Sequence, residues 1–189
     1  RARLHRLMGL DDDQVVLFLH GGASTQFFQW PMNVLRGGTA AYLDTGRWAK
    51  LASAEAKRFG AVVTPFSSAE ARYDRVPGPE EALAIPEGAV YLHYTSNNTV
   101  AGTQFHHVPA APAGTLLACD MSSDILSRPM DGSQYDFIYA GAQKNLGPSG
   151  VTVVVVRRSL FERFDPNLPT MLRYQVAAEN DSMYNTPNT

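Results

Sequence analysis

Lys144 is the residue whose type and position point most directly to chemistry. It lies in the glycine-containing turn Ala140-Gly-Ala-Gln-Lys-Asn145, directly after the apolar run at residues 137–139. A lysine at the end of a buried strand loses solvation, which disfavours the ammonium form, and the neutral amine can attack a carbonyl. Lys144 is therefore a candidate Schiff-base lysine, with a solvated loop lysine as the competing interpretation.

Asp120 gives this lysine a possible partner. It ends a second apolar run, residues 115–119, and lies 24 positions upstream of Lys144. A carboxylate and an amine at neighbouring strand ends could hold the two poles of pyridoxal phosphate, with Asp120 at the ring nitrogen and Lys144 at the aldehyde. The pair predicts a cofactor site at one edge of a sheet.

A glycine-rich turn after an earlier apolar run offers a place for a phosphate. In His20-Gly-Gly-Ala-Ser-Thr-Gln26 the glycines let the backbone bend, and Ser24 and Thr25 open a helix. The free N–H groups and the dipole of a helix start favour an anion. A purely structural turn with a serine cap is the alternative.

The same turn also suggests an α/β hydrolase, because His-Gly-Gly after a strand resembles an oxyanion loop. That class of enzyme needs a G-x-S-x-G nucleophile elbow. The chain has none; Gly147-Pro-Ser-Gly150 comes nearest but lacks the spacing. The hydrolase interpretation would also leave Asp120 and Lys144 without a role.

Composition limits the remaining classes. The chain has 189 residues, 44% of them hydrophobic and 18% charged, which is ordinary for a globular protein. Sixteen basic and eighteen acidic residues give a net charge of −2, and no dense basic block favours nucleic acid. No apolar run approaches the ~20 residues of a membrane span. The single Cys119 suits a reducing compartment, so we expect a cytoplasmic location. No histidine has partners at metal-ligand spacing, so we expect no metal site.

The pattern of apolar runs predicts an α/β fold with a mainly parallel sheet. Most runs are continuously apolar, as in strands buried on both faces, and helical patterns separate them. We expect one domain without an internal linker. The predicted strands are residues 15–19, 61–64, 89–93, 115–119, 135–139 and 151–156. The predicted helices are residues 25–35, interrupted by Pro31, and 46–59, with Gly60 as C-cap, and shorter helical starts are expected at residues 80–83 and after Arg157.

Two further segments carry weaker signals. Trp48, near the start of its predicted helix, could stack on a flat ring, although tryptophan on an apolar helix face is more often core. Thr95-Ser-Asn-Asn-Thr99 follows a strand and offers hydroxyls and amides, which an Asx-type turn explains equally well.

Together these segments resemble the phosphoserine aminotransferase family, which are class V pyridoxal-phosphate enzymes of fold type I. Five tracts match in family order along nearly the whole chain. They are Leu17-Phe-Leu-His-Gly-Gly-Ala-Ser-Thr-Gln-Phe27, Tyr91-Leu-His-Tyr-Thr-Ser-Asn-Asn-Thr99, Asp120-Met-Ser-Ser-Asp-Ile-Leu-Ser-Arg128, Tyr139-Ala-Gly-Ala-Gln-Lys-Asn-Leu-Gly-Pro148 and Ser182-Met-Tyr-Asn-Thr-Pro187. The resemblance implies a three-layer α/β/α fold in which residues 1–189 form part of the large cofactor-binding domain.

The resemblance also implies a role for each site residue. Lys144 would bond the cofactor covalently and move the substrate proton, and Asp120 would pair with the pyridinium nitrogen. The other implied cofactor-binding residues are Trp48 on the ring, Thr99 at the phenolic oxygen, Ala23, Ser24 and Gln143 at the phosphate, and Asn185 and Thr186 at the phosphate of a partner subunit. Ala23 and Ser24 stand where some members have Gly-Arg, so a backbone contact survives there but a charged one does not.

By this resemblance the protein is a homodimeric transaminase of serine biosynthesis. Its substrates would be a phosphorylated amino acid and a 2-oxo acid, interconverting phosphoserine and 2-oxoglutarate with 3-phosphooxypyruvate and glutamate. The family's substrate-binding histidines and arginines lie in regions that this sequence does not contain, and both ends look like cuts through a longer protein. Two alternatives therefore stay open: a class V aminotransferase for another small amino acid, and a core that binds cofactor without transamination.

Overall fold

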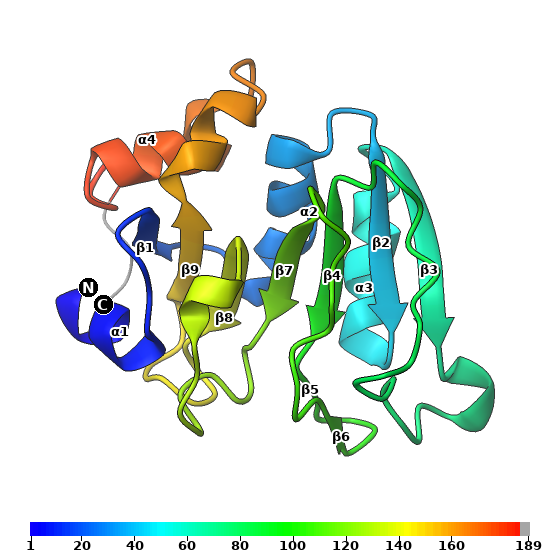
Figure 1. The fold of residues 1–189 in the computed structure, drawn as a ribbon. Helices are drawn as coiled ribbons and strands as arrows, with labels where there is room; N and C mark the ends of the chain where they lie inside the picture. The colour runs from blue at the N-terminus through cyan, green and yellow to red at the C-terminus, as the bar shows by residue number, and fades with distance from the viewer. Residues whose placement is uncertain (186–189) are drawn as a thin grey trace.

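A seven-stranded sheet forms the centre of the computed structural model, which describes residues 1–185 (Figure 1). The strand order is β1-β9-β8-β7-β4-β2-β3, and β5 and β6 form a separate small hairpin. The strands are β1 (Gln14–Leu19), β2 (Thr39–Asp44), β3 (Ala61–Ser67), β4 (Tyr91–Thr95), β5 (Asn97–Asn98), β6 (Thr103–Gln104), β7 (Leu116–Asp120), β8 (Phe137–Gly141) and β9 (Thr152–Arg157).

Strand direction brings most carboxyl ends to one edge. Strands β3, β2, β4, β7 and β8 are parallel to one another, whereas β9 is antiparallel to both β8 and β1. Two reversals leave β1 running in the same direction as β8. Every strand of this sheet except β9 therefore ends at the same edge, and the predicted mainly parallel sheet is confirmed.

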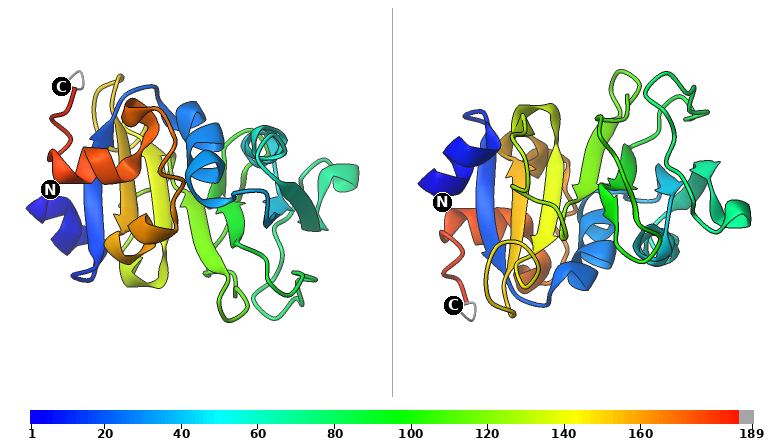
Figure 2. Two further views of the ribbon diagram at one scale, coloured as in Figure 1. Left: turned by 90° about the horizontal axis from the view of Figure 1, so that it is seen from above. Right: turned by 90° about the horizontal axis from the view of Figure 1, so that it is seen from below.

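The two faces of the sheet have different coverings (Figure 2). Helices α2 (Ala23–Val34), α3 (Arg47–Ala56) and α4 (Tyr174–Glu179) pack against one face, which we call the helix face. The opposite face is covered by α1 (Ala2–Met8) and by irregular segments that carry Val76, Leu83, Ile85 and Val108. The predicted α/β class is confirmed, and its second covering layer consists mostly of irregular chain.

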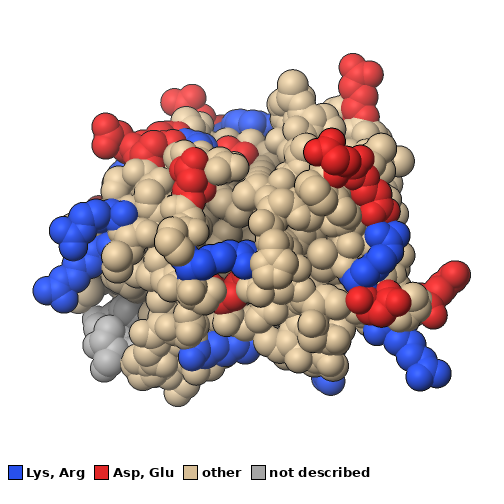
Figure 3. Space-filling model, turned by 60° about the horizontal axis from the view of Figure 1, so that its bottom comes forward, with Lys and Arg blue, Asp and Glu red and all other residues tan. Residues whose placement is uncertain are grey.

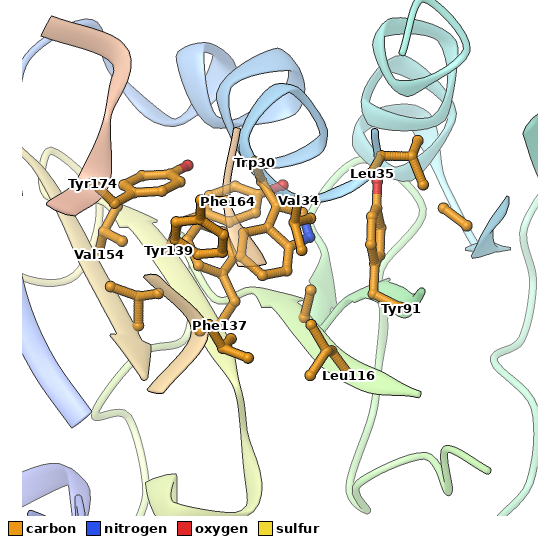
Figure 4. Packing of buried hydrophobic residues seen from close by; sticks show 14 of the residues in the cluster. Trp30, Val34, Leu35, Tyr91, Leu116, Phe137, Tyr139, Val154, Phe164 and Tyr174 are labelled. Carbon is orange, nitrogen blue, oxygen red and sulfur yellow. The ribbon is translucent and has the colours of Figure 1, made fainter. Parts of the chain in front are cut away.

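Aromatic rings fill the core of the helix face (Figure 4). Trp30 of α2 is 1% exposed and stacks on Phe137 of β8, with ring centroids 4.1 Å apart and planes 14° apart. Phe164 meets Trp30 edge-on at 6.1 Å, and Tyr174 of α4 lies 5.4 Å from Phe137. The burial of such large rings makes a dominant contribution to the stability of a hydrophobic core. This cluster fixes α2 and α4 against the middle of the sheet.

Several predicted elements need correction. Strand β2 was missed because its sequence begins Thr-Ala-Ala, and alanine is a poor strand former. The predicted helical start at residues 80–83 is a turn and irregular chain, and the one after Arg157 is the 3-10 helix Arg158–Arg163. The helix predicted at residues 25–35 is not interrupted: α2 runs continuously through Pro31.

Gly60 is not the C-cap of α3, which is Lys57. It is needed instead because the chain passes very close to Gly38 there. A Cβ at position 60 would lie 2.3 Å from the Gly38 carbonyl oxygen, closer than real Cβ contacts come. The Gly38 carbonyl also accepts a 2.9 Å hydrogen bond from the Ala61 N–H at the start of β3. Glycine at this position therefore lets β3 begin beside the end of α2.

Candidate functional site

Asp120 is the last residue of β7 and lies on the helix face, because side chains alternate along the strand and Leu116 and Ala118 face that core. Its side chain is 5% exposed. Burial raises the pKa of Asp120, while hydrogen bonds from Ser122 and the charge of Lys144 oppose that rise. The structure thus holds this carboxyl group in a fixed orientation at the edge of the sheet.

Ser122 connects Asp120 to the next strand, and sequence reasoning gave it no role. Its N–H and its hydroxyl both donate to Asp120 Oδ1, at 2.9 and 2.6 Å. The Ser122 hydroxyl in turn accepts the Gly141 N–H at the end of β8, at 3.1 Å. An aspartate two residues before a serine is the signature of an Asx-type turn, so the signal was present in the tract.

Lys144 lies in a turn that begins at Ala142, where the end of β8 leaves the sheet. Two bonds anchor the turn: the Ala142 N–H donates to the Val151 carbonyl at 2.9 Å, and the Asn145 amide donates to the Ile125 carbonyl at 2.6 Å. The predicted loss of solvation at Lys144 is wrong for this chain, since the side chain is exposed. The turn extends past the last strand residues, so the amine lies over the edge of the sheet and not within it.

The start of α2 lies at the same edge. Gly21 and Gly22 have φ values of 94° and 70°, in the region that favours glycine, and Gly22 is the N-cap of the helix. Ala23 is half-buried and Ser24 is exposed. The first N–H groups of a helix have no intrahelical acceptor and carry partial positive charge. The turn thus presents backbone donors together with the Ser24 hydroxyl.

Trp48 comes from the start of α3, on the other side of this edge. Its ring centroid is 5.4 Å from Lys144 Nζ, and its Nε1 is buried without a hydrogen-bond partner among the described residues. The residue before α3 is Gly46. Any larger residue would be crowded there, because a Cβ at position 46 would come within 2.8 Å of Asn98 Oδ1. The same amide oxygen accepts the Thr45 hydroxyl at 3.2 Å, so the β5–β6 hairpin is held against the start of α3.

These segments enclose one hollow of about 470 Å³, including the solvent at its mouth. Six of the predicted site residues line it, and Gly22, Phe27 and Ser122 complete it. The six are Ala23, Ser24, Trp48, Asp120, Gln143 and Lys144. The structure therefore brings together residues that are up to 121 positions apart, from 23 to 144.

Two of the described predicted residues, Thr99 and Asn185, do not line this hollow. Thr99 is exposed at the turn of the β5–β6 hairpin. Asn185 is exposed and lines a separate, more apolar hollow of about 750 Å³ between β1 and the segment around Thr170, where its carbonyl is 3.1 Å from His20 Nε2. Thr186 lies outside the described residues.

The donor set fits the predicted cofactor, pyridoxal phosphate. A buried carboxylate suits a protonated ring nitrogen, an amine suits an aldehyde, an indole suits a flat ring, and a helix start suits a phosphate. Among residues 1–185, no three His, Cys, Asp or Glu side chains come together as a metal site would require. Charges of both signs are scattered over this edge of the molecule, without a continuous surface of one sign in the view of Figure 3.

Comparison with known proteins identifies relatives along the whole chain. The sequence profile of the family "Aminotransferase class-V" matches residues 1–189. The chain is 50% identical to a phosphoserine aminotransferase of Geobacillus kaustophilus, over all of this chain and 52% of that protein. It is 51% identical to one from Pseudomonas entomophila, over 98% of this chain and 51% of that protein. The chain thus spans about half the length of the curated relatives it matches.

Solved structures give the same relation. The phosphoserine aminotransferase from Bacillus circulans subsp. alkalophilus matches with a TM-score of 0.93 and 50% identity, over 99% of this chain and 52% of that one. The PLP-bound phosphoserine aminotransferase from Trichomonas vaginalis matches with a TM-score of 0.88 and 35% identity, over 100% and 53%. No helix in the described part of the chain is long and apolar enough to cross a bilayer.

Proposed function

Because the chain belongs to the class-V aminotransferase family, we propose that it is part of the large, cofactor-binding domain of a phosphoserine aminotransferase. The proposed reaction transfers an amino group between phosphoserine and 2-oxoglutarate on one side and 3-phosphooxypyruvate and glutamate on the other, as a step of serine biosynthesis. The observation that carries the proposal is the meeting of Asp120 and Lys144 in one hollow with the start of α2 and with Trp48.

Asp120 and Ser122 would set the charge at the inner end of the hollow. Pyridoxal phosphate, when bound, supplies a ring that accepts the electron pair left as a substrate carbon loses its proton. The Asp120 carboxylate would pair with the protonated ring nitrogen. The two hydrogen bonds from Ser122 both fall on Oδ1, so they fix the plane of the carboxylate while it does so.

Lys144 would carry out proton transfer at Nζ. Its amine would hold the cofactor at the aldehyde, and the same nitrogen would take a proton from the substrate carbon. The anchored turn holds Nζ near the Trp48 ring. Lys144 is exposed in this chain, and bound cofactor would cover part of its side chain.

The start of α2 would bind the phosphate, with the N–H groups of Ala23 and Ser24, the Ser24 hydroxyl and the Gln143 amide as donors. Trp48 would cover one face of the ring. Thr99, on the hairpin next to the Asn98 that touches Gly46, would reach the phenolic oxygen.

A homodimer is the proposed assembly, with Asn185 and Thr186 reaching the phosphate of the partner subunit. Asn185 supports this because it lies apart from the hollow of its own chain and its side chain is exposed. The proposed location is the cytoplasm.

Covalent trapping tests the cofactor assignment. The protein at its full natural length, mixed with pyridoxal phosphate, should gain visible absorption, and borohydride should then fix the cofactor to the Lys144 peptide in a mass spectrum. Lys144→Ala should abolish both signals. Lys50→Ala is the matched control, because Lys50 is exposed on α3 two residues from Trp48. Trapping on another lysine would refute the assignment.

A substrate panel tests the reaction. With 2-oxoglutarate as acceptor, phosphoserine should be the preferred amino donor over serine, alanine and aspartate. Preference for one of the unphosphorylated donors would identify another class-V aminotransferase. Cofactor trapping without turnover of any donor would identify a core that binds cofactor and does not transaminate.

A further inference from the structure

Beneath the hollow, polar side chains from the three adjacent strands β4, β7 and β8 share the helix face. His93 of β4, Ala118 of β7 and Phe137 of β8 lie side by side in register, and Thr95, Asp120 and Tyr139 form the next such row. Ala118 is small, so the His93 and Tyr139 rings can meet across β7. His93 Nε2 is 3.0 Å from the Tyr139 hydroxyl, and the two rings stack with centroids 5.9 Å apart.

Burial fixes the protonation of both rings. It lowers the pKa of His93 to about 3, so the imidazole is neutral and carries one N–H. It raises the pKa of Tyr139, so the phenol keeps its proton. Two arrangements of the hydrogen bond between them are then possible: the phenol donates to Nε2, or Nε2–H donates to the phenol.

The surroundings favour donation from Nε2. His93 Nδ1 is buried without a partner among the described residues. If the phenol donated, the imidazole proton would sit on Nδ1 as a buried donor without an acceptor, which proteins seldom tolerate. With the proton on Nε2, only a lone pair goes unused. The phenolic O–H is also released for another acceptor.

Asp120 is the carboxylate on the neighbouring strand β7. It is paired in register with Tyr139. Tyr139 lowers the pKa of the Asp120 carboxyl group, as a donating hydroxyl does. A bond to a carboxylate is charge-assisted and about twice as strong as one between neutral groups. Donation to Asp120 is therefore the better use of the phenolic proton.

We propose that His93 and Tyr139 form a positioning relay for Asp120. His93 donates from Nε2 to the Tyr139 oxygen and turns the phenolic O–H toward Asp120, where it holds the ionised carboxylate facing the hollow. Neither residue touches the reacting atoms; both act through Asp120. The catalytic value of the relay rests on the proposed function, in which Asp120 pairs with the cofactor nitrogen.

Nuclear magnetic resonance tests the relay without cofactor. In the full-length protein labelled with nitrogen-15 histidine, His93 should be neutral and protonated on Nε2 at neutral pH. With carbon-13 aspartate, Tyr139→Phe should raise the pKa of the Asp120 carboxyl group, and His93→Phe should raise it less. The double variant should have the same Asp120 pKa as Tyr139→Phe alone, because His93 acts on Asp120 only through the Tyr139 hydroxyl. Tyr42→Phe is the matched control. It removes a buried hydroxyl that is hydrogen-bonded to the Tyr91 hydroxyl at 2.8 Å, and it keeps the ring that stacks on His93.

A second readout uses bound cofactor. Tyr139→Phe should retain pyridoxal phosphate about tenfold less tightly, the effect of one lost charge-assisted hydrogen bond. His93→Gln, which keeps an N–H donor, should recover most of what His93→Phe loses and guards against a variant that fails to fold. Protonation of His93 on Nδ1, or an Asp120 titration unmoved by Tyr139→Phe, would overturn the relay. Failure of cofactor to bind Lys144, with the Asp120 titration shifted as expected, would refute the proposed function and leave the relay standing.

Discussion

The aromatic core on the helix face and the hollow at the carboxyl edge of the sheet use the same strands in different ways. Trp30, Phe137 and Tyr174 are at most 1% exposed and are held mainly by ring packing, to which the Tyr174 hydroxyl adds a 2.6 Å hydrogen bond donated to Gln26 Oε1. In the hollow, Lys144, Gln143 and Ser24 are exposed, and Asp120 alone among its charged groups is buried.

This difference separates stability from chemistry. Core residues contribute burial, so their loss should be felt as a lower free energy of unfolding. Edge residues contribute donors, acceptors and charge, so their loss should be felt in binding and rate. Strands β7 and β8 join the two regions, because each carries core residues along its length and a site residue or turn at its end.

The largest expected effect on stability is in the core. Trp30→Ala removes a ring that stacks on Phe137 and meets Phe164, and should lower the free energy of unfolding by about 3–5 kcal/mol in chemical denaturation. Trp30→Phe is the control and should cost much less, because it keeps a ring and removes an Nε1 that is buried without a partner in the described chain. A loss below about 1 kcal/mol for Trp30→Ala would mean that the core does not depend on this stack.

At the edge, Asp120→Asn should have the opposite profile. If the proposed function holds, we expect the transamination rate to fall about 100-fold or more, because the variant would remove the anionic partner of the cofactor's ring nitrogen. Kinetics of the full-length enzyme with phosphoserine measures this. A rate within a factor of two of wild type would remove Asp120 from the proposed mechanism.

The same variant should not lose stability when cofactor is absent. Folding raises the pKa of Asp120, so its contribution to stability is fully present below the unfolded pKa of about 3.9 and is lost as pH rises through the folded pKa. Asparagine does not ionise, so this pH-dependent loss of stability does not occur in the variant. The free energy of unfolding should therefore decline less for Asp120→Asn than for wild type between about pH 4 and pH 7. A steeper decline for Asp120→Asn than for wild type would show that the ionised form of Asp120 stabilises the folded protein.

Ser122→Ala tests the junction between the regions. It leaves the buried Gly141 N–H without its acceptor and removes one donor from Asp120, so it should cost about 1–3 kcal/mol in stability and also raise the pKa of Asp120. Ser123→Ala is the matched control, since that neighbouring hydroxyl donates only a 3.2 Å bond to the Asn97 carbonyl. Equal losses for the two variants would contradict the special role of Ser122.

The sequence was enough for prediction where a residue type and its position had a single structural explanation. Continuous valine and leucine runs gave the buried strands, and the residues after β1, β7 and β8 gave most of the hollow. It failed at β2, where alanines are tolerated because the sheet there is buried under α3, whose Ala49, Ala52 and Ala56 are buried as well. Such complementarity between two elements is not visible in either segment alone.

The site shows the same limit. Ser122 was missed because its importance depends on the Gly141 N–H from another strand. The loss of solvation predicted for Lys144 was wrong because a turn's reach beyond the sheet edge depends on contacts with segments distant in sequence. The hydrogen bond from the Asn145 amide to the Ile125 carbonyl is one such contact. Residue types indicated the chemistry, but contacts between segments set the geometry.

The smallest expected effect comes from Thr152, a core-like residue at the edge. It is fully buried in β9, opposite Leu19 and Gly141, and its hydroxyl has no partner among the described residues. Valine has the same shape and belongs to the run that follows. Thr152→Val should raise the free energy of unfolding by about 1 kcal/mol, because a buried hydroxyl without a hydrogen bond is costly, and should leave the transamination rate unchanged. Thr64→Val on exposed β3 should change neither quantity. If Thr152→Val instead slowed the reaction, burial at the edge would serve the site as well as the core, and the separation between the two regions would fail at β9.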